Sequence, residues 1–154
     1  MKKGIFIFIF LFFLFTFQIF AADLSGTWQG PGEVTFSFGK KMPCSKITIR
    51  INHGPHQLMV SSYQARCGLL QPDWGPRPFD LADGKVYEDG EQIGTFDGHL
   101  FKTLATATGV QYAFNFKVND DQNGNPETLQ TYYGTRNLSG AVVVEGVLKR
   151  VGVK

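Results

Sequence analysis

Apolar and polar residues alternate along most of the chain beyond residue 25. Ile47, Ile49 and Ile51 alternate with polar residues, and segments 34–38 and 111–118 show the same pattern. A period of two places successive side chains on opposite faces of a strand, so each segment predicts a half-buried strand with one solvated face. Apolar residues three and four apart are not sustained over about 11 residues, which argues against helices.

Four Asp-Gly or Asn-Gly pairs separate these segments, at 83–84, 89–90, 97–98 and 123–124. Such pairs are the strongest hairpin signals, because both central residues of the tight turn need a positive φ. The pattern predicts strands at 26–38, 45–52, 57–66, 85–88, 91–96, 99–104, 110–118, 127–135 and 141–151. We therefore expect an all-β fold, a single antiparallel up-and-down β-barrel of about eight strands, with one long connection at 67–84. A β-sandwich is the alternative.

Residues 1–21 differ from the rest of the chain. Two lysines precede an almost unbroken apolar run from Ile5 to Phe20, which contains eight of the 15 phenylalanines. This pattern is typical of a secretory signal peptide, whereas a membrane span needs about 20 apolar residues. We expect cleavage after Ala21, so that residues 22–154 form a β-barrel domain exported to the periplasm or the extracellular space.

Composition and charge narrow the class of partner. An apolar content of 43% and a charged content of 18% argue against a disordered chain. Removal of residues 1–21 takes away two of the 15 basic residues and leaves 13 against 13 acidic ones. A net charge of zero argues against nucleic acid or an anionic membrane as an electrostatic partner. No stable membrane insertion is expected once the signal has been cleaved.

The two cysteines, Cys44 and Cys67, lie at equal distances along the chain from a turn at 53–56. They are expected to face each other across the second and third strands, which in an exported protein predicts a disulfide. Both have the opposite parity to the ladder from Ile47 to Ile51, so the sequence places them off the core face. A C-x-x-C motif is absent from the sequence, which argues against thiol–disulfide catalysis.

The domain opens with Leu24-Ser25-Gly26-Thr27-Trp28. A G-x-W at the start of the first strand, followed by successive antiparallel strands, resembles the lipocalins and the wider calycin group. The resemblance implies structural roles for Gly26, Trp28 and Arg150, with the indole packed across the closed end of the barrel. A basic side chain of the last strand, here Arg150, is expected to stack over it as a cation–π contact. Ser-Gly-Thr-Trp also resembles the start of avidin-type barrels, but two tryptophans in the chain are few for a biotin site.

The potential metal ligands and catalytic groups in the sequence do not form a pattern that predicts a metal site or an active site. His53 and His56 share a four-residue turn, with His99 elsewhere, and the acidic segment 119–127 partly matches the spacing of a calcium loop. Both are interpreted as solvated turns, and neither a metal nor a cofactor is predicted. The motifs G-x-S-x-G and H-E-x-x-H are absent, and the carboxylates between 80 and 97 lie mostly on turns, so we do not expect an enzyme.

The segment 69–79 is the most informative for function. It carries three prolines, Trp74 and Phe79, and a stiff loop with aromatic residues at a barrel mouth suits a ligand. We predict that the barrel binds an apolar or amphipathic small molecule, with Arg77 holding an acidic head group. The predicted contacts are Trp74, Arg77, Phe79, Tyr112, Phe114 and Phe116. The same aromatic side chains could instead fill the interior as core.

The alternative is a protein-binding module. Small exported barrels that inhibit metalloproteases resemble this chain in beginning with Ser-Gly-x-Trp and in carrying one disulfide. They insert their N-terminal segment into the protease, and Ala22–Ser25 is comparably short. The sequence thus leaves a small apolar molecule or a protein as the partner, with the small molecule preferred.

Overall fold

The computed structural model describes residues 22–152, so the predicted signal peptide lies outside the described residues. Residues 22–152 form strands, turns and irregular segments, and no helix in this part of the chain is long and apolar enough to cross a bilayer. The strands are β1 (Gly26–Phe36), β2 (Lys41–His53), β3 (Gln57–Arg66), β4 (Asp73–Trp74), β5 (Arg77–Ala82), β6 (Lys85–Glu88), β7 (Glu91–Phe96), β8 (Leu100–Thr103), β9 (Ala105–Ala107), β10 (Val110–Asp120), β11 (Pro126–Asn137) and β12 (Gly140–Val151).

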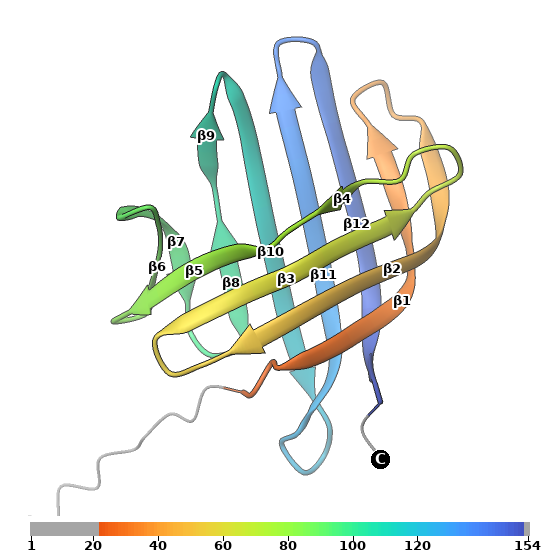
Figure 1. The fold of residues 1–154 in the computed structure, drawn as a ribbon. Coiled ribbons are helices and arrows are strands. Elements are labelled where there is room, and N and C mark those ends of the chain that lie inside the picture. The colour runs from red at the N-terminus through yellow and green to blue at the C-terminus, as the bar shows by residue number, and fades with distance from the viewer. Residues whose placement is uncertain (1–21, 153–154) are drawn as a thin grey trace, which may run out of the picture.

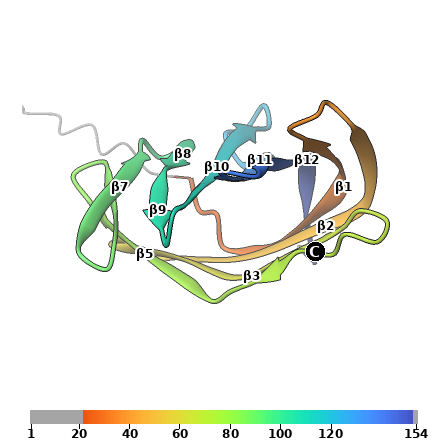
Figure 2. The same cartoon turned by 90° about the horizontal axis from the view of Figure 1, so that it is seen from above.

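All strand pairings are antiparallel, and together they close into a ring. The order runs β1, β2, β3, β5, β6, β7, β8, β10, β11 and β12, and β12 pairs with β1 to complete it. The short strands β4 and β9 attach to β3 and β10. Seen from above, the ring is flattened, with β2, β3 and β5 along one long side and β10, β11 and β12 along the other (Figure 2). The all-β, antiparallel expectation is confirmed.

The number of strands was underestimated: residues 22–152 form 12 strands, against nine predicted segments and an expected barrel of about eight strands. The three strands that the pattern missed are β4, β5 and β9. The first two occupy the segment 67–84, which was predicted to be one long connection because of its three prolines. Pro78 nevertheless sits opposite Met59 within the β3–β5 ladder, because a strand accepts proline where the ladder needs no N–H from it. β9 has only three residues, too few for a period of two to be visible.

Two of the four Gly-containing turns have the conformation that the sequence predicts. In the β5–β6 and β6–β7 turns, Asp83 and Asp89 have φ values of 50° and 51°, and the glycines that follow have 73° and 84°. Both central residues are therefore left-handed, as in a tight hairpin turn. The strand predicted at 26–38 ends earlier, at Phe36, and Phe38 lies on the turn with 73% of its surface exposed.

Cys44 and Cys67 form a disulfide, as predicted, but both are buried in the core rather than off it. A β-bulge explains the error. Gly30 is opposite Ile47 while Gly32 is opposite Cys44, so β2 uses three residues where β1 uses two. The extra residue reverses the alternation within β2. Parity counted from the ladder at Ile47 therefore gives the wrong face for Cys44.

A second bulge reverses the alternation of inward and outward side chains within β3. Arg50 pairs with Ser62 and Ile51 with Val60, which leaves one unpaired residue in β3. Inward positions therefore change from even numbers at Val60 to odd numbers at Tyr63, and both side chains are fully buried. This switch directs Tyr63 into the interior.

We call the two openings of the ring the upper and lower ends, as oriented in Figure 1. At the lower end Trp28 is fully buried, and its indole N–H donates to the carbonyl of Leu24 at 3.0 Å. The guanidinium carbon of Arg150 lies 4.8 Å from the centre of the indole, and the same side chain donates to the carbonyl of Asp23. Gly26 has a φ of 128°, which an L side chain adopts only with strain. These contacts cover the part of the lower end around Trp28 with the chain's own N-terminal segment.

Candidate functional site

Four aromatic rings meet in the interior toward the upper end. Trp74 of β4 stacks on Tyr63 of β3, with ring centres 5.1 Å apart and planes within 12°. Its other contacts are Phe114 of β10 at 5.2 Å and Tyr133 of β11 at 5.5 Å. The indole of Trp74 therefore reaches from one long side of the flattened ring to the other, between β3 and the β10–β11 pair.

Three polar atoms at or beside this cluster are buried without a hydrogen-bond partner among the described residues. They are the indole nitrogen of Trp74, the hydroxyl of Tyr63 and the hydroxyl of Thr131. Burial raises the pKa of Tyr63, and the neighbouring Tyr133 adds to the effect, so the phenol stays protonated as a donor. Buried polar groups are normally paired, and an unpaired one costs about 1–3 kcal/mol. The cluster thus holds donors that an acceptor atom would satisfy.

An ion pair flanks the aromatic cluster. Arg77 of β5 donates from Nε and Nη2 to the two carboxylate oxygens of Glu88 on β6, the second at 2.8 Å. Its guanidinium carbon lies 4.1 Å from the ring centre of Tyr112, and the Tyr112 hydroxyl donates to Glu88 at 3.4 Å. The side chains of Arg77 and Glu88 are only 23% and 16% exposed. The charge of Arg77 is therefore already balanced inside the site.

The pKa of Arg77 follows from the same geometry. Burial by itself would lower it, because desolvation disfavours the charged form. The hydrogen bonds and the negative charge of Glu88 outweigh burial, and the pKa of Arg77 lies above its ordinary value. The guanidinium remains charged throughout the accessible pH range, and Glu88 is the group that neutralises it.

A groove of about 260 Å³ opens at the upper end, directly above the cluster. Its lining includes Phe36, Phe38, Thr135 and Val142, from the β1–β2 and β11–β12 hairpins. Thr135 pairs with Val142 in the β11–β12 ladder, and it is the next inward-facing residue of β11 above Tyr133. The groove therefore lies on the approach from solvent toward the aromatic rings, and its walls near the interior are mainly apolar.

The structure brings the predicted site residues into two groups. Arg77 lies beside Tyr112 and at 5.8 Å from the ring of Phe79, while Trp74 contacts Phe114. Phe79, Phe114 and Phe116 are each about 1% exposed and belong to the core. Phe116 lies deepest, stacked at 4.6 Å on Phe101.

Sequence reasoning missed Tyr63, Glu88 and Tyr133. Glu88 was grouped with the exposed turn carboxylates, although it shares its parity with the buried Val86. That parity was a usable signal for an inward carboxylate. The position of Tyr63 was hidden by the bulge in β3, and nothing in the sequence pairs Tyr133 with Trp74.

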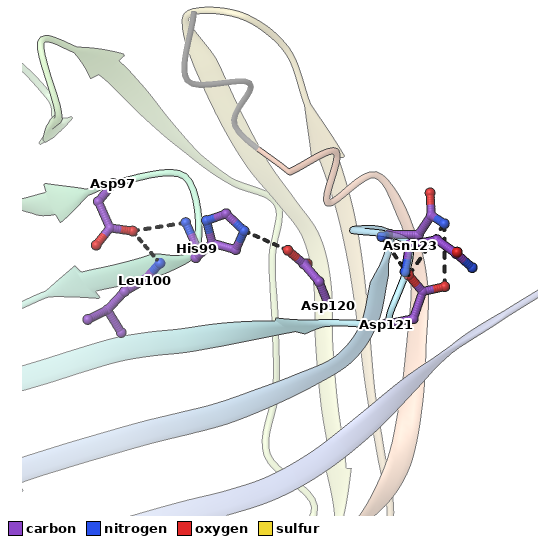
Figure 3. A network of polar contacts seen from close by, with 7 residues as sticks. Asp97, His99, Leu100, Asp120, Asp121 and Asn123 are labelled. Carbon is purple, nitrogen blue, oxygen red and sulfur yellow. Dashed lines mark hydrogen bonds and ion pairs between the residues drawn. The ribbon is translucent and has the colours of Figure 1, made fainter. Parts of the chain in front are cut away.

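The lower end holds the histidines and the acidic loop. His99 Nε2 lies 2.8 Å from Asp120, and the Asp97 carboxylate accepts from the backbone N–H groups of His99 and Leu100 (Figure 3). Asp121 accepts from the backbone of its own loop, which lowers its pKa. Among residues 22–152, His, Cys, Asp and Glu side chains form no group of three or more that could hold a metal ion.

The segment Ala22–Ser25 is fastened to the lower end. Ala22 donates to the carbonyl of Gly98, and the Ser25 hydroxyl donates to the carbonyl of His53. Leu24 is fully buried. Insertion of this segment into a protease would require Leu24 to leave the core, which is a cost that a free N-terminal tail would not have.

The sequence matches no known family model and no curated protein.

Proposed function

We propose that the protein is an exported β-barrel, similar in plan to the lipocalins, that binds a small apolar molecule at its upper end. The observation that carries the proposal is the buried, unpaired indole N–H of Trp74 within a cluster of aromatic rings. Ligand sites combine mainly apolar walls with a few polar groups that fix orientation. The groove between Phe36 and Val142 supplies the approach to that cluster.

The electrostatics favour a neutral ligand with a hydrogen-bond acceptor. Because Glu88 already balances Arg77 with two hydrogen bonds, an acidic head group would have to displace that carboxylate. The unpaired groups at Trp74 and Tyr63 are donors, which suit a hydroxyl or carbonyl oxygen. An alcohol, ketone or ester of a long-chain compound therefore fits better than the acidic head group expected from the sequence.

Two further features support the lipocalin-like plan and the exported location. The ring of strands closes on itself, and Arg150 lies over Trp28 at the lower end, which is the contact that the G-x-W resemblance implies. The disulfide between Cys44 and Cys67 suits an oxidising compartment. Residues 22–28 cover only part of the lower end, where a pocket of about 640 Å³ opens between the β2–β3, β5–β6 and β7–β8 turns. The upper end is the entrance in this proposal because its groove leads toward the unpaired donors of the aromatic cluster.

The test is calorimetric titration with two ligands of equal chain length, dodecanol and dodecanoate. We expect dodecanol to bind more tightly than dodecanoate. Trp74→Phe keeps the ring but removes the N–H, and we expect its affinity for dodecanol to fall by about tenfold, the value of one hydrogen bond. Tyr63→Phe is expected to act in the same direction.

The matched control is Tyr132→Phe, the same chemical change on the outward face of β11. We expect it to leave the affinity unchanged. If neither ligand binds, or if the inward and outward tyrosine variants behave alike, the proposed site is wrong.

A further inference from the structure

Large apolar side chains are exposed at the upper end of the molecule. Six are strongly exposed among residues 22–152, and three of them lie in connections at this end. Leu69 follows β3, and Phe38 and Leu138 lie in the β1–β2 and β11–β12 turns. Phe38 is 73% exposed, and Leu69 and Leu138 are fully exposed. We call these three residues the apolar rim.

The connections of the apolar rim project from the upper part of the ring (Figure 1). They come from three separate places in the sequence, so only the closed sheet gathers them at one end. The β1–β2 and β11–β12 turns are in contact, since the N–H of Ser37 donates to the carbonyl of Ala141 at 2.9 Å. Exposed apolar residues gathered at one end indicate an interaction surface, whereas scattered ones do not.

Basic residues flank every part of the apolar rim. Lys40 is two residues from Phe38, and Arg136 is two residues from Leu138. Arg66 precedes Leu69. The segments 36–42, 66–72 and 134–144 contain four basic residues and no Asp or Glu, although Asp73 directly follows the second segment. Of these four, only Lys41 forms an ion pair within the described part of the chain, with Glu33.

Most acidic residues lie elsewhere. Asp23, Asp83, Asp97, Asp120 and Asp121 belong to the lower end. The acidic hairpin between β6 and β7 lies at the side of the ring (Figures 1 and 2). The separation is partial, because Glu33 and Asp73 lie beside the basic residues of the upper end, and Lys85 and Arg150 lie among the acidic residues of the lower end. The overall balance of charge therefore hides an excess of basic residues at the upper end and of acidic residues at the lower end. A field of this kind orients a protein on a negatively charged surface.

We propose that the upper end docks reversibly on a lipid bilayer with anionic headgroups. Phe38, Leu138 and their neighbours enter the boundary between headgroups and acyl chains, and the flanking lysines and arginines contact the headgroup phosphates. Apolar burial and attraction to anionic lipid act together at such an interface. Docking in this orientation presents the groove above Trp74 to the membrane. Phe38 also lines the groove of the proposed ligand site, but Leu69, Leu138 and the flanking basic residues lie outside that groove. Docking therefore does not require that the groove binds a ligand.

The test is co-sedimentation of the exported, processed protein with phosphatidylcholine vesicles, prepared with and without phosphatidylglycerol. Residues 22–152 form the closed ring and its core, and mass spectrometry establishes that residues 1–21 have been removed. We expect binding to vesicles that contain phosphatidylglycerol and at least tenfold weaker binding to pure phosphatidylcholine. Added sodium chloride is expected to weaken the binding, because it screens the headgroup charge.

Two double variants separate the apolar and charged contributions. Phe38→Ser with Leu138→Ser removes apolar burial, and we expect a loss of about tenfold or more. Lys40→Gln with Arg136→Gln removes two charges, and we expect a loss of roughly 25-fold on anionic vesicles, from about fivefold for each charge. These side chains are exposed, so the fold is expected to be retained.

The controls make the same chemical changes away from the upper end. Val147→Ser alters an apolar residue that is 50% exposed on β12, and Lys85→Gln alters an exposed lysine at the lower end. We expect vesicle binding to be unchanged in both. The proposal is wrong if the unmodified protein does not bind vesicles that contain phosphatidylglycerol. The apolar rim would then remain as a contact for another protein. The proposal is also wrong if the controls lose binding as much as the rim variants. Dodecanol titration without vesicles reports on the ligand site separately.

Discussion

Replacement of Glu88 by glutamine tests the electrostatic basis of the candidate site. The substitution keeps the size and shape of the side chain but removes the negative charge. Arg77 would then keep at most one hydrogen-bond acceptor at this position, and it would lie over Tyr112 with a charge that no carboxylate balances. Both stability and ligand preference are expected to change.

The effect on stability can be bounded from burial. Breaking a fully buried pair by removing one partner costs about 3–5 kcal/mol, whereas exposed pairs contribute about 0–1 kcal/mol. The Arg77 and Glu88 side chains are 23% and 16% exposed, so the expected loss is intermediate, at about 2 kcal/mol. Urea denaturation of the Glu88→Gln variant measures it. Glu91→Gln, at an exposed position in the same hairpin, is the control and is expected to change stability by less than about 0.5 kcal/mol.

The effect on ligand preference has the opposite sign for the two test compounds. With Glu88 neutral, Arg77 is free to bind a carboxylate through charge-assisted hydrogen bonds, which are about twice as strong as neutral ones. We expect dodecanoate to gain about five- to tenfold in affinity relative to dodecanol, since the difference amounts to about 1–1.4 kcal/mol. Calorimetric titration of both compounds against both variants measures this ratio.

Two results would refute this reasoning. An unchanged free energy of unfolding would show that Glu88 does not balance Arg77 in the folded protein. An unchanged ratio of dodecanoate to dodecanol affinity, in a variant that has lost stability, would show that the ligand does not approach Arg77. The second result leaves the ion pair as a structural feature and moves the ligand site away from β5.

Three other predictions concern the frame around the site. Reduction of the Cys44–Cys67 disulfide, which closes a loop with a sequence separation of 23, is expected to cost about 3 kcal/mol of unfolding free energy, measured by urea titration with and without reductant. Arg150→Gln removes the cation over the buried indole at the lower end and is expected to cost about 1–2 kcal/mol by the same assay, whereas substitution of the neighbouring Lys149 is expected to cost little. Burial lowers the pKa of His53 in the fold, against the opposing effects of a backbone carbonyl and a carboxylate. The unfolded chain therefore binds this proton more readily, so stability is expected to fall as pH decreases below about 6.5, and His53→Gln is expected to lack that decrease.

The regular parts of the fold were predictable from local patterns. Alternation and turn signals together identified nine of the strands, including the ladder of Ile47, Ile49 and Ile51, all of which are buried. The Asp-Gly pairs at Asp83 and Asp89 adopt the left-handed conformations that tight hairpins need. These features depend on residues adjacent in the chain, and their physical causes, side-chain alternation and the freedom of glycine, act at that range.

The face of each side chain beyond a bulge was not predictable in this way. One extra residue in β2 and one in β3 reverse the alternation, which brings Cys44 and Tyr63 into the core. Gly30-Pro31-Gly32 marks a bend in the sequence at the position of the first bulge. It does not show that the extra residue lies in β2, because that is a property of the pairing between two strands. Nothing local marks the second bulge. The candidate site was not predictable for the same reason, since the stacking of Trp74 on Tyr63 depends on the shifted register of β3.

By itself, the sequence determined an all-β chain of short antiparallel strands, its hairpin turns and its disulfide. The tertiary structure decided how the strands close into a ring, and the closure determines which distant residues meet. It pairs Arg77 with Glu88, places Trp74 between opposite walls, and gathers Phe38, Leu69 and Leu138 at one end beside Lys40, Arg66 and Arg136. Alternation acts between neighbours in the chain, whereas electrostatic balance and surface patches depend on distances in space, which only the closed sheet specifies.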